Sequence, residues 1–175
     1  MDAALDQLEE RGVLAGLNLR EVASAAGVTT ANIYHLFGSR QSLVRATLGR
    51  EVAALASPLE EAERLGFVDR RLRMFDAIVG TPTLRLTALL ALDDDPDYSP
   101  LPFIEASRAW HEEQAATGGL DPDVDAEALH LLGVATSIGV AIYADVAARQ
   151  LGADPTELTA RVRTTFARLL ASVVP

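Results

Sequence analysis

The chain has 175 residues, of which 49% are hydrophobic, and this is enough to bury a sizeable core in one large domain or two small ones. The absence of cysteine excludes disulfide bonds, thiolate metal sites and thiol catalysis. The net charge of −10 argues against nucleic-acid binding by the chain as a whole, so the distribution of that charge matters.

Charge is divided unevenly along the chain. Residues 1–50 carry five arginines and five acids, whereas residues 51–175 carry ten arginines and twenty acids. Within residues 15–50 there is a single acid, Glu21, against Arg20, Arg40, Arg45 and Arg50. This local excess of positive charge could bind phosphates. The alternative is a random distribution of charged residues along the sequence. The charged residues 1–11 lack the apolar core of a signal peptide, so we expect a cytoplasmic protein.

Helical apolar spacing runs through the chain, which predicts an all-α fold of about nine helices. Capping residues place the helices near 2–11, 18–26, 29–37, from 39 through 52, 67–79, 82–92, 103–117, 124–151 and 155–173. Ser57-Pro58 predicts a kink or a restart, and residues 93–102 predict a loop. We divide the chain into a head, residues 1–50, which has three helices and the start of a connecting helix, and a larger helical body, residues 51–175.

Residues 128–144 form a stretch of 17 residues without Asp, Glu or Arg. This is close to the length of a membrane-spanning helix, which is usually about 20 residues. His130, Thr136 and Ser137 interrupt the stretch, so we predict a buried helix and no membrane partner.

The segment LREVASAAGVTTANIYHL, residues 19–36, has the spacing of a helix-turn-helix. The close helix crossing needs a small residue, Ala23, and the turn needs a residue that tolerates positive φ, Gly27. We expect the small shared core to contain Val22, Ala26, Val28, Ile33 and Leu36. An ordinary αα-hairpin with a glycine turn is the alternative, but it does not require this full set of residues.

The second helix of the pair is then the DNA-reading helix, and its N-terminal end faces the major groove. Asn32 could pair with adenine, and Thr30 could reach a base edge or a thymine methyl group. Phosphates are the expected partners of Tyr34, His35 and Arg40, and the alternative for Arg40 is a solvated surface residue. The candidate DNA-binding residues are Asn18, Thr29, Thr30, Ala31, Asn32, Tyr34, His35 and Arg40.

The run AGVTTANIYHLFGSRQSLVRATL resembles the TetR (tetracycline-repressor-like) regulators over roughly residues 2–50. The matching positions are Ala26-Gly27-Val28, Tyr34, Phe37, Ser39-Arg40 and Leu43. The resemblance implies a symmetric homodimer on a near-palindromic double-stranded DNA operator, released by a small-molecule effector. Family members usually begin with a basic arm before the position of Met1, so either the arm is missing here or the true start lies upstream, and they usually carry lysine where Arg40 stands. A missing arm would weaken DNA binding.

The body offers candidates for two further sites. An apolar pocket between the middle helices could be lined by Met74, Phe75, Ile78, Leu86, Leu90, Phe103, Trp110, His111 and Tyr143, unless these residues are core. Two closing helices with broad apolar faces could pack against a second copy through Leu132, Ala135, Gly139, Ile142, Val146, Leu158, Val162, Phe166 and Leu169, unless these belong to the monomer core.

We therefore predict a transcriptional regulator, a repressor released from its operator by a small, largely apolar ligand. Residues 1–50 would be its helix-turn-helix DNA-binding domain, and residues 51–175 its helical ligand-sensing and dimerisation domain. The alternative is a helical ligand-binding or interaction protein whose short N-terminus impairs DNA binding. We expect no enzyme, cofactor or metal site, because His35, His111 and His130 lack metal-ligand spacing. The acidic run at 93–97 lacks the glycine and the closing glutamate of a calcium loop.

Overall fold

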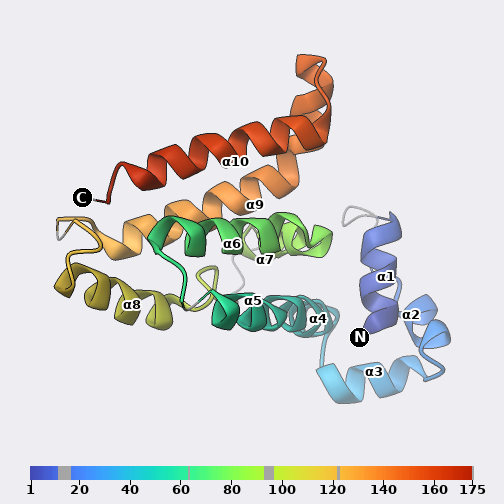
Figure 1. Ribbon diagram of the computed structural model, residues 1–175. Helices are drawn as coiled ribbons and strands as arrows, with labels where there is room; N and C mark the ends of the chain where they lie inside the picture. The colour runs from blue at the N-terminus through green and yellow to red at the C-terminus, as the bar shows by residue number, and fades with distance from the viewer. Residues whose placement is uncertain (12–16, 63, 93–96, 122, 175) are drawn as a thin grey trace. The chain divides into compact units, whose positions relative to one another are not determined.

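The computed structural model describes residues 1–11, 17–62, 64–92, 97–121 and 123–174, and this part of the chain is helical without strands (Figure 1). The predicted all-α class is confirmed. Ten α-helices and one 3-10 helix are present in the described residues, against about nine expected. The count differs because the expected restart at Ser57-Pro58 is a separate short helix, α5 (Ala56–Glu61).

The chain divides into two compact units. The first, here called the head, comprises Met1–Ala54 and Leu86–Tyr98. The second, here called the body, comprises Leu55–Arg85 and Ser99–Pro175. The sequence division at residue 50 had assigned all of 86–98 to the second unit. Part of the 93–102 segment, residues 93–96, lies outside the described residues, as does the predicted stop of the first helix at Gly12.

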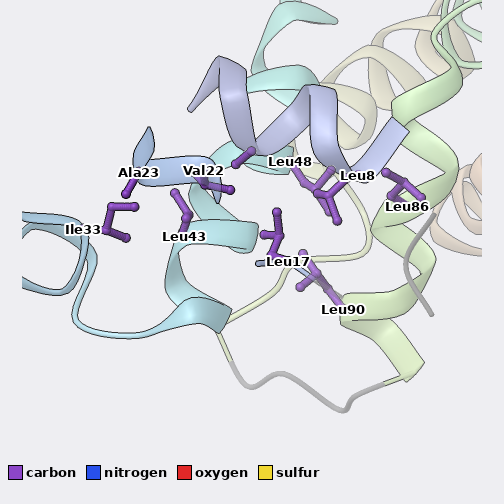
Figure 2. Packing of buried hydrophobic residues seen from close by; sticks show 10 residues of the cluster. Leu8, Leu17, Val22, Ala23, Ile33, Leu43, Leu48, Leu86 and Leu90 are labelled. Carbon is purple, nitrogen blue, oxygen red and sulfur yellow. The ribbon is translucent and has the colours of Figure 1, made fainter. Parts of the chain in front are cut away.

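The head contains α1 (Asp2–Arg11), α2 (Leu19–Ala25), α3 (Thr30–Phe37), α4 (Arg40–Ala54) and α7 (Thr87–Leu92). Its core draws on all of these helices and on the residues just before α2 and α7 (Figure 2). The buried core residues are Ala4, Leu8, Leu17, Val22, Ala23, Ile33, Leu43, Leu48, Leu86 and Leu90. Leu86 and Leu90 are spaced four residues apart, so both present their side chains to the same core. They were expected to line the pocket of the body, and that prediction is wrong.

The core of the helix-turn-helix is smaller than expected. Val22 and Ile33 are buried, but Val28 is 45% exposed and Leu36 is 73% exposed. Ala26 is exposed as well. Ile33 and Phe37, four residues apart, define the inward face of α3, and Leu36 points about 100° away from Phe37.

The body is built from α5, α6 (Phe67–Val79), α8 (Ile104–Ala116), α9 (Ala126–Leu151) and α10 (Pro155–Ala171), and a 3-10 helix at Pro82–Leu86 precedes α7 in the chain. Helix α9 packs on α6, α8 and α10, and α10 lies beside it in Figure 1. Aspartate side chains cap the first turns of both long helices, and Gly152 at φ 63° ends α9. The body core contains Phe67, Leu72, Phe75, Leu120, Phe166 and Leu170.

Helix α9 is more exposed than predicted. Among the described helices it alone, as a single helix, is long and apolar enough to cross a membrane, with a mean hydropathy of 1.7, and 11% of that window is buried. Leu132, Tyr143 and Val146 are between 53% and 65% exposed. The expected burial of residues 128–144 is therefore wrong for a single chain. An exposed apolar surface of this kind is typical of a face that contacts another molecule.

Candidate DNA-binding and effector sites

Asn18 fixes the start of α2. Its Oδ1 accepts a hydrogen bond from the backbone N–H of Arg20 at 3.1 Å, and its Nδ2 donates to Glu21 at 2.7 Å. Its backbone N–H donates to Gln7 Oε1 at 2.7 Å, which ties α1 to the entrance of α2. Asn18 is therefore a helix cap, and both polar atoms of its side chain are already engaged within the head.

A capping box fixes the start of α3. Gly27 makes the turn at φ 66°, a backbone conformation that side chains disfavour. The Thr29 hydroxyl accepts from the backbone N–H of Asn32 at 3.1 Å, and Asn32 Oδ1 accepts from the backbone N–H of Thr29 at 3.1 Å. A bidentate contact of Asn32 to adenine would need both its Oδ1 and its Nδ2. In this conformation Oδ1 serves the cap, so Nδ2 is the atom left to donate to a base.

The outer face of α3 is open to solvent. Tyr34 is 52% exposed, and Ile33, on the inner face, is 5% exposed. The other candidate residues at this end of the head are partly or fully exposed, namely Thr29, Thr30, Ala31, Asn32, His35 and Arg40. None of them lies beneath other side chains of the described residues, so α3 has a free surface that could lie in a DNA groove. Leu36 was not a candidate, but its exposed apolar side chain lies on this free surface.

Ion pairs inside the head reduce its free positive charge. Arg45 contacts Asp97 at 3.0 Å, and Arg50 contacts Asp2 at 2.5 Å. Of the four arginines counted in residues 15–50, Arg20 and Arg40 are left as exposed cations within the described part of the head. Arg40 stands in the first turn of α4, where free backbone N–H groups also favour an anion.

The body encloses a narrow cavity of about 60 Å³. Five of the predicted pocket residues line it, namely Met74, Phe75, Ile78, Phe103 and Trp110. The other lining residues are Leu55, Leu59, Arg70, Arg71, Pro102, Ser107, His130, Gly133, Val134, Ser137 and Phe166. Phe103 has φ 61°, a left-handed conformation that is strained for an aromatic residue. The cavity is thus apolar along most of its length, with a polar end on α6, α8 and α9.

Two further pocket candidates lie elsewhere in the body. Tyr143 is 65% exposed on α9 and does not line the cavity, so that prediction is wrong. His111 is 3% exposed and lies behind the cavity wall, against Phe67, Trp110 and Arg71. It does not line the cavity itself and contacts residues that do, Trp110 and Arg71.

Arg71, which is half-buried, forms the centre of the polar end, and sequence reasoning missed it because Arg70-Arg71 looks like a solvated pair on a helix. Arg71 Nη2 lies 2.9 Å from His111 Nε2 and donates to Ser107 Oγ at 3.2 Å. Its Nη1 lies 3.4 Å from His130 Nδ1. Its Nε is buried and has no hydrogen-bond partner among the described residues. Burial, with some repulsion from Arg70, lowers the pKa of Arg71 to about 10, so it stays cationic at neutral pH.

Both histidines must be neutral to accept hydrogen bonds from Arg71. His111 Nδ1 lies 2.5 Å from the backbone oxygen of Ser107, and His130 Nε2 lies 3.1 Å from that of Pro102. These carbonyl groups can only accept, so each ring keeps its proton on that nitrogen and offers the other to Arg71. Burial lowers the pKa of each histidine, and the charge of Arg71 acts in the same direction.

We expect acid to destabilise the body through these two histidines. Because their pKa values are lowered on folding, the unfolded chain binds protons more readily below the ordinary pKa of 6.5. The contribution of the neutral rings to stability is present above pH 6.5 and is lost as the pH falls below it. Thermal unfolding between pH 7.5 and 5 should therefore show a falling Tm.

The matched variants keep the hydrogen bonds to the backbone and remove the titration. His111→Asn places an amide N–H near the position of Nδ1, and His130→Gln places one near Nε2. The double variant should show a flatter Tm profile over this pH range than the wild type. An unchanged slope would contradict the assignment of the acid sensitivity to these rings.

The proposed dimer surface is largely exposed in the single chain. Leu132, Val146 and Leu169 are 60%, 53% and 64% exposed. Shallow grooves along α9 and α10 are lined by other predicted interface residues, namely Ala135, Gly139, Leu158 and Val162. Ile142 is half-buried. Phe166 is 7% exposed, and its ring lies 5.8 Å from that of Phe75, so it belongs to the monomer core and its assignment to the surface is wrong.

The geometry therefore defines a class of protein: a helix-turn-helix head with an open reading helix, joined to a helical body that contains a cavity. Residues 1–47 match the family model described as bacterial regulatory proteins, tetR family. The head is therefore similar to the tetR family of bacterial regulatory proteins over these residues, and the whole chain has the fold of solved TetR-family structures.

Solved structures of such regulators resemble the entire chain. A TetR transcriptional regulator from Chloroflexus aurantiacus has 22% identity and a TM-score of 0.69, with 99% of this chain and 91% of that chain covered. A Rhodococcus sp. protein assigned to the TetR-family regulators has 17% identity and a TM-score of 0.76, with 99% and 95% covered. GusR from Salmonella enterica has 21% identity and a TM-score of 0.70, with 97% and 92% covered. No curated protein sequence matches the chain.

Proposed function

We propose that the chain is a homodimeric transcriptional repressor that binds a near-palindromic operator and leaves it when a small, largely apolar ligand enters the body. The observation that carries this proposal is the capped α2–α3 pair, whose second helix has a buried inner face and a free outer face. A separate unit with its own core and cavity gives the effector a place to bind.

On DNA, α3 would lie in the major groove with its N-terminal end toward the bases. The Asn32 Nδ2 group donates to a base acceptor while Oδ1 holds the cap, and Thr30 contacts a neighbouring base edge. Tyr34, His35 and Arg40 contact phosphates and set the position of the helix without specifying sequence.

Two heads are needed, because one short helix reads only a few base pairs. A twofold dimer presents two reading helices to two half-sites one helical turn apart, which explains a near-palindromic operator. The exposed apolar residues of α9 and α10 supply the surface for this association. Burying that surface against a second copy also removes the apolar side of α9 from water, as expected of a cytoplasmic protein.

Selection from a random-sequence double-stranded DNA library tests the proposal. We expect the purified protein to enrich a near-palindromic site, and fluorescence anisotropy should then show specific binding at 150 mM salt. Arg40→Ala should weaken binding about tenfold on every sequence. It should also reduce the salt slope by about one for each phosphate that the protein no longer neutralises.

Arg64→Ala is the matched control, because Arg64 is an exposed arginine of the body. It should leave DNA affinity unchanged. Failure to enrich any sequence above non-specific binding would refute the operator-binding proposal.

A further inference from the structure

The cavity of the body contains a cation that no acid of the described residues neutralises. Within that part of the chain the hydrogen-bond partners of Arg71 are His130, Ser107 and His111, its guanidinium lies 5.9 Å from the centre of the Phe67 ring, and none of these groups is a carboxylate. A guanidinium has five N–H donors, so these three hydrogen bonds leave donors unused, including the buried Nε. Buried charges are normally paired, and an unpaired one is unfavourable.

The histidines beside Arg71 cannot supply the missing negative charge. Each ring accepts from Arg71 with one nitrogen, which requires a neutral imidazole, and donates to a backbone carbonyl group with the other. Arg70, a buried arginine on the same helix, lies over the ring of Trp110 at 4.8 Å and also lines the cavity. The polar end is thus built to receive an anion.

The side chains that line the rest of the cavity favour a ligand with an apolar hydrocarbon part. Met74, Phe75 and Ile78 line it from α6, and the Leu55, Leu59 and Phe166 side chains close it. A volume of about 60 Å³ admits only a few non-hydrogen atoms without rearrangement, since one water occupies roughly 10–15 Å³ by the same measure. A ligand with one planar anionic group on a short hydrocarbon chain fits this space better than a phosphate ester or a ring system.

We propose that this cavity binds a short organic carboxylate, with the acid group on Arg71 and Ser107 and the hydrocarbon part along Met74 and Phe75. This deepens, and rests on, the proposed function of the body as an effector domain. Nη2 of Arg71 is occupied by Ser107 and His111, so the carboxylate would accept from Nη1 or Nε, and a charge-assisted hydrogen bond is roughly twice as strong as a neutral one. The ligand supplies the negative charge that the protein lacks.

Trp110 provides the measurement, because it is the only tryptophan of the chain and it lines the cavity. The full-length protein is titrated with straight-chain saturated carboxylates of three to six carbons, which do not absorb at the excitation wavelength. Matching primary amides and primary amines serve as probes of the same shape. We expect carboxylates to change Trp110 fluorescence and raise Tm, amides to bind about tenfold more weakly or worse, and amines to give no change.

Two variants separate a ligand contact from a structural role. Arg71→Met keeps the side-chain length and removes the charge. It should abolish the preference for carboxylate over amide while leaving the Tm of the ligand-free protein equal or higher. Arg73→Met is the matched control on the same helix, since Arg73 is exposed and pairs with Glu61. It should bind carboxylates like the wild type.

Equal binding of amide and carboxylate by the wild type, or an unchanged preference in Arg71→Met, would overturn the proposal. A lower Tm of ligand-free Arg71→Met with the carboxylate preference retained would show a structural arginine and would also overturn it. The same carboxylates are then added to the protein bound to its selected DNA. Binding at Trp110 without DNA release supports the carboxylate site and contradicts the repressor mechanism. Release of the DNA by carboxylates supports both the carboxylate site and the repressor mechanism.

Discussion

Replacing Val146 by arginine is expected to turn a dimer into a monomer and to lower operator affinity by roughly a hundredfold or more. Val146 is 53% exposed on α9, so the substitution leaves the core of the single chain intact. In a twofold interface the same position occurs twice, which buries two unpaired like charges. The effect on DNA binding follows because the second half-site is no longer held.

Sedimentation equilibrium at micromolar concentration measures the first effect, and fluorescence anisotropy on the selected operator measures the second. Leu92→Arg is the control, because Leu92 is 81% exposed on α7 in the head. The control should remain dimeric. A Val146→Arg protein that is still a dimer would show that this face of α9 is not the interface.

Leu43→Ala is expected to destabilise the head by about 3 kcal/mol and to abolish DNA binding near its unfolding temperature. Leu43 is 1% exposed, and the side chains of α1, α2, α3 and α7 share its core. Removing it leaves a cavity that a small helical domain cannot readily collapse. For a unit of this size, such a change is a large part of its total stability.

Chemical denaturation followed by circular dichroism measures the destabilisation, and Trp110 reports on the body separately. We expect an early transition without a change in Trp110 fluorescence, because Leu43 and Trp110 belong to different cores. Leu36→Ala is the control, since Leu36 is 73% exposed, and its effect on stability should stay within about 0.5 kcal/mol. A comparably small effect of Leu43→Ala would contradict its role in the core.

The helices and their ends follow from local sequence. Thr29, Asp125 and Asp154 each cap the helix that follows with a side-chain oxygen, and Gly27 takes the positive φ that the turn requires. These interactions span only a few residues, so they can be identified without the fold. The position of the reading helix was predictable for the same reason.

The faces of the helices were less predictable. Leu36 was expected inside and is exposed, because the inward direction of α3 depends on what the rest of the head places against it. Leu86 and Leu90 have the apolar spacing of core residues, and spacing cannot distinguish the core of the head from that of the body. The exposed side of α9 was mistaken for a buried one for a similar reason.

By itself, the sequence determined an all-helical chain with a helix-turn-helix near its start, since caps, turns and apolar periods are local properties. Only the tertiary structure decided which core each leucine joins and that Arg71 lies in a cavity where no acid of the described residues meets it. Burial and charge pairing depend on residues distant along the chain, and Arg71 meets His111 and His130 only after α6, α8 and α9 have packed together.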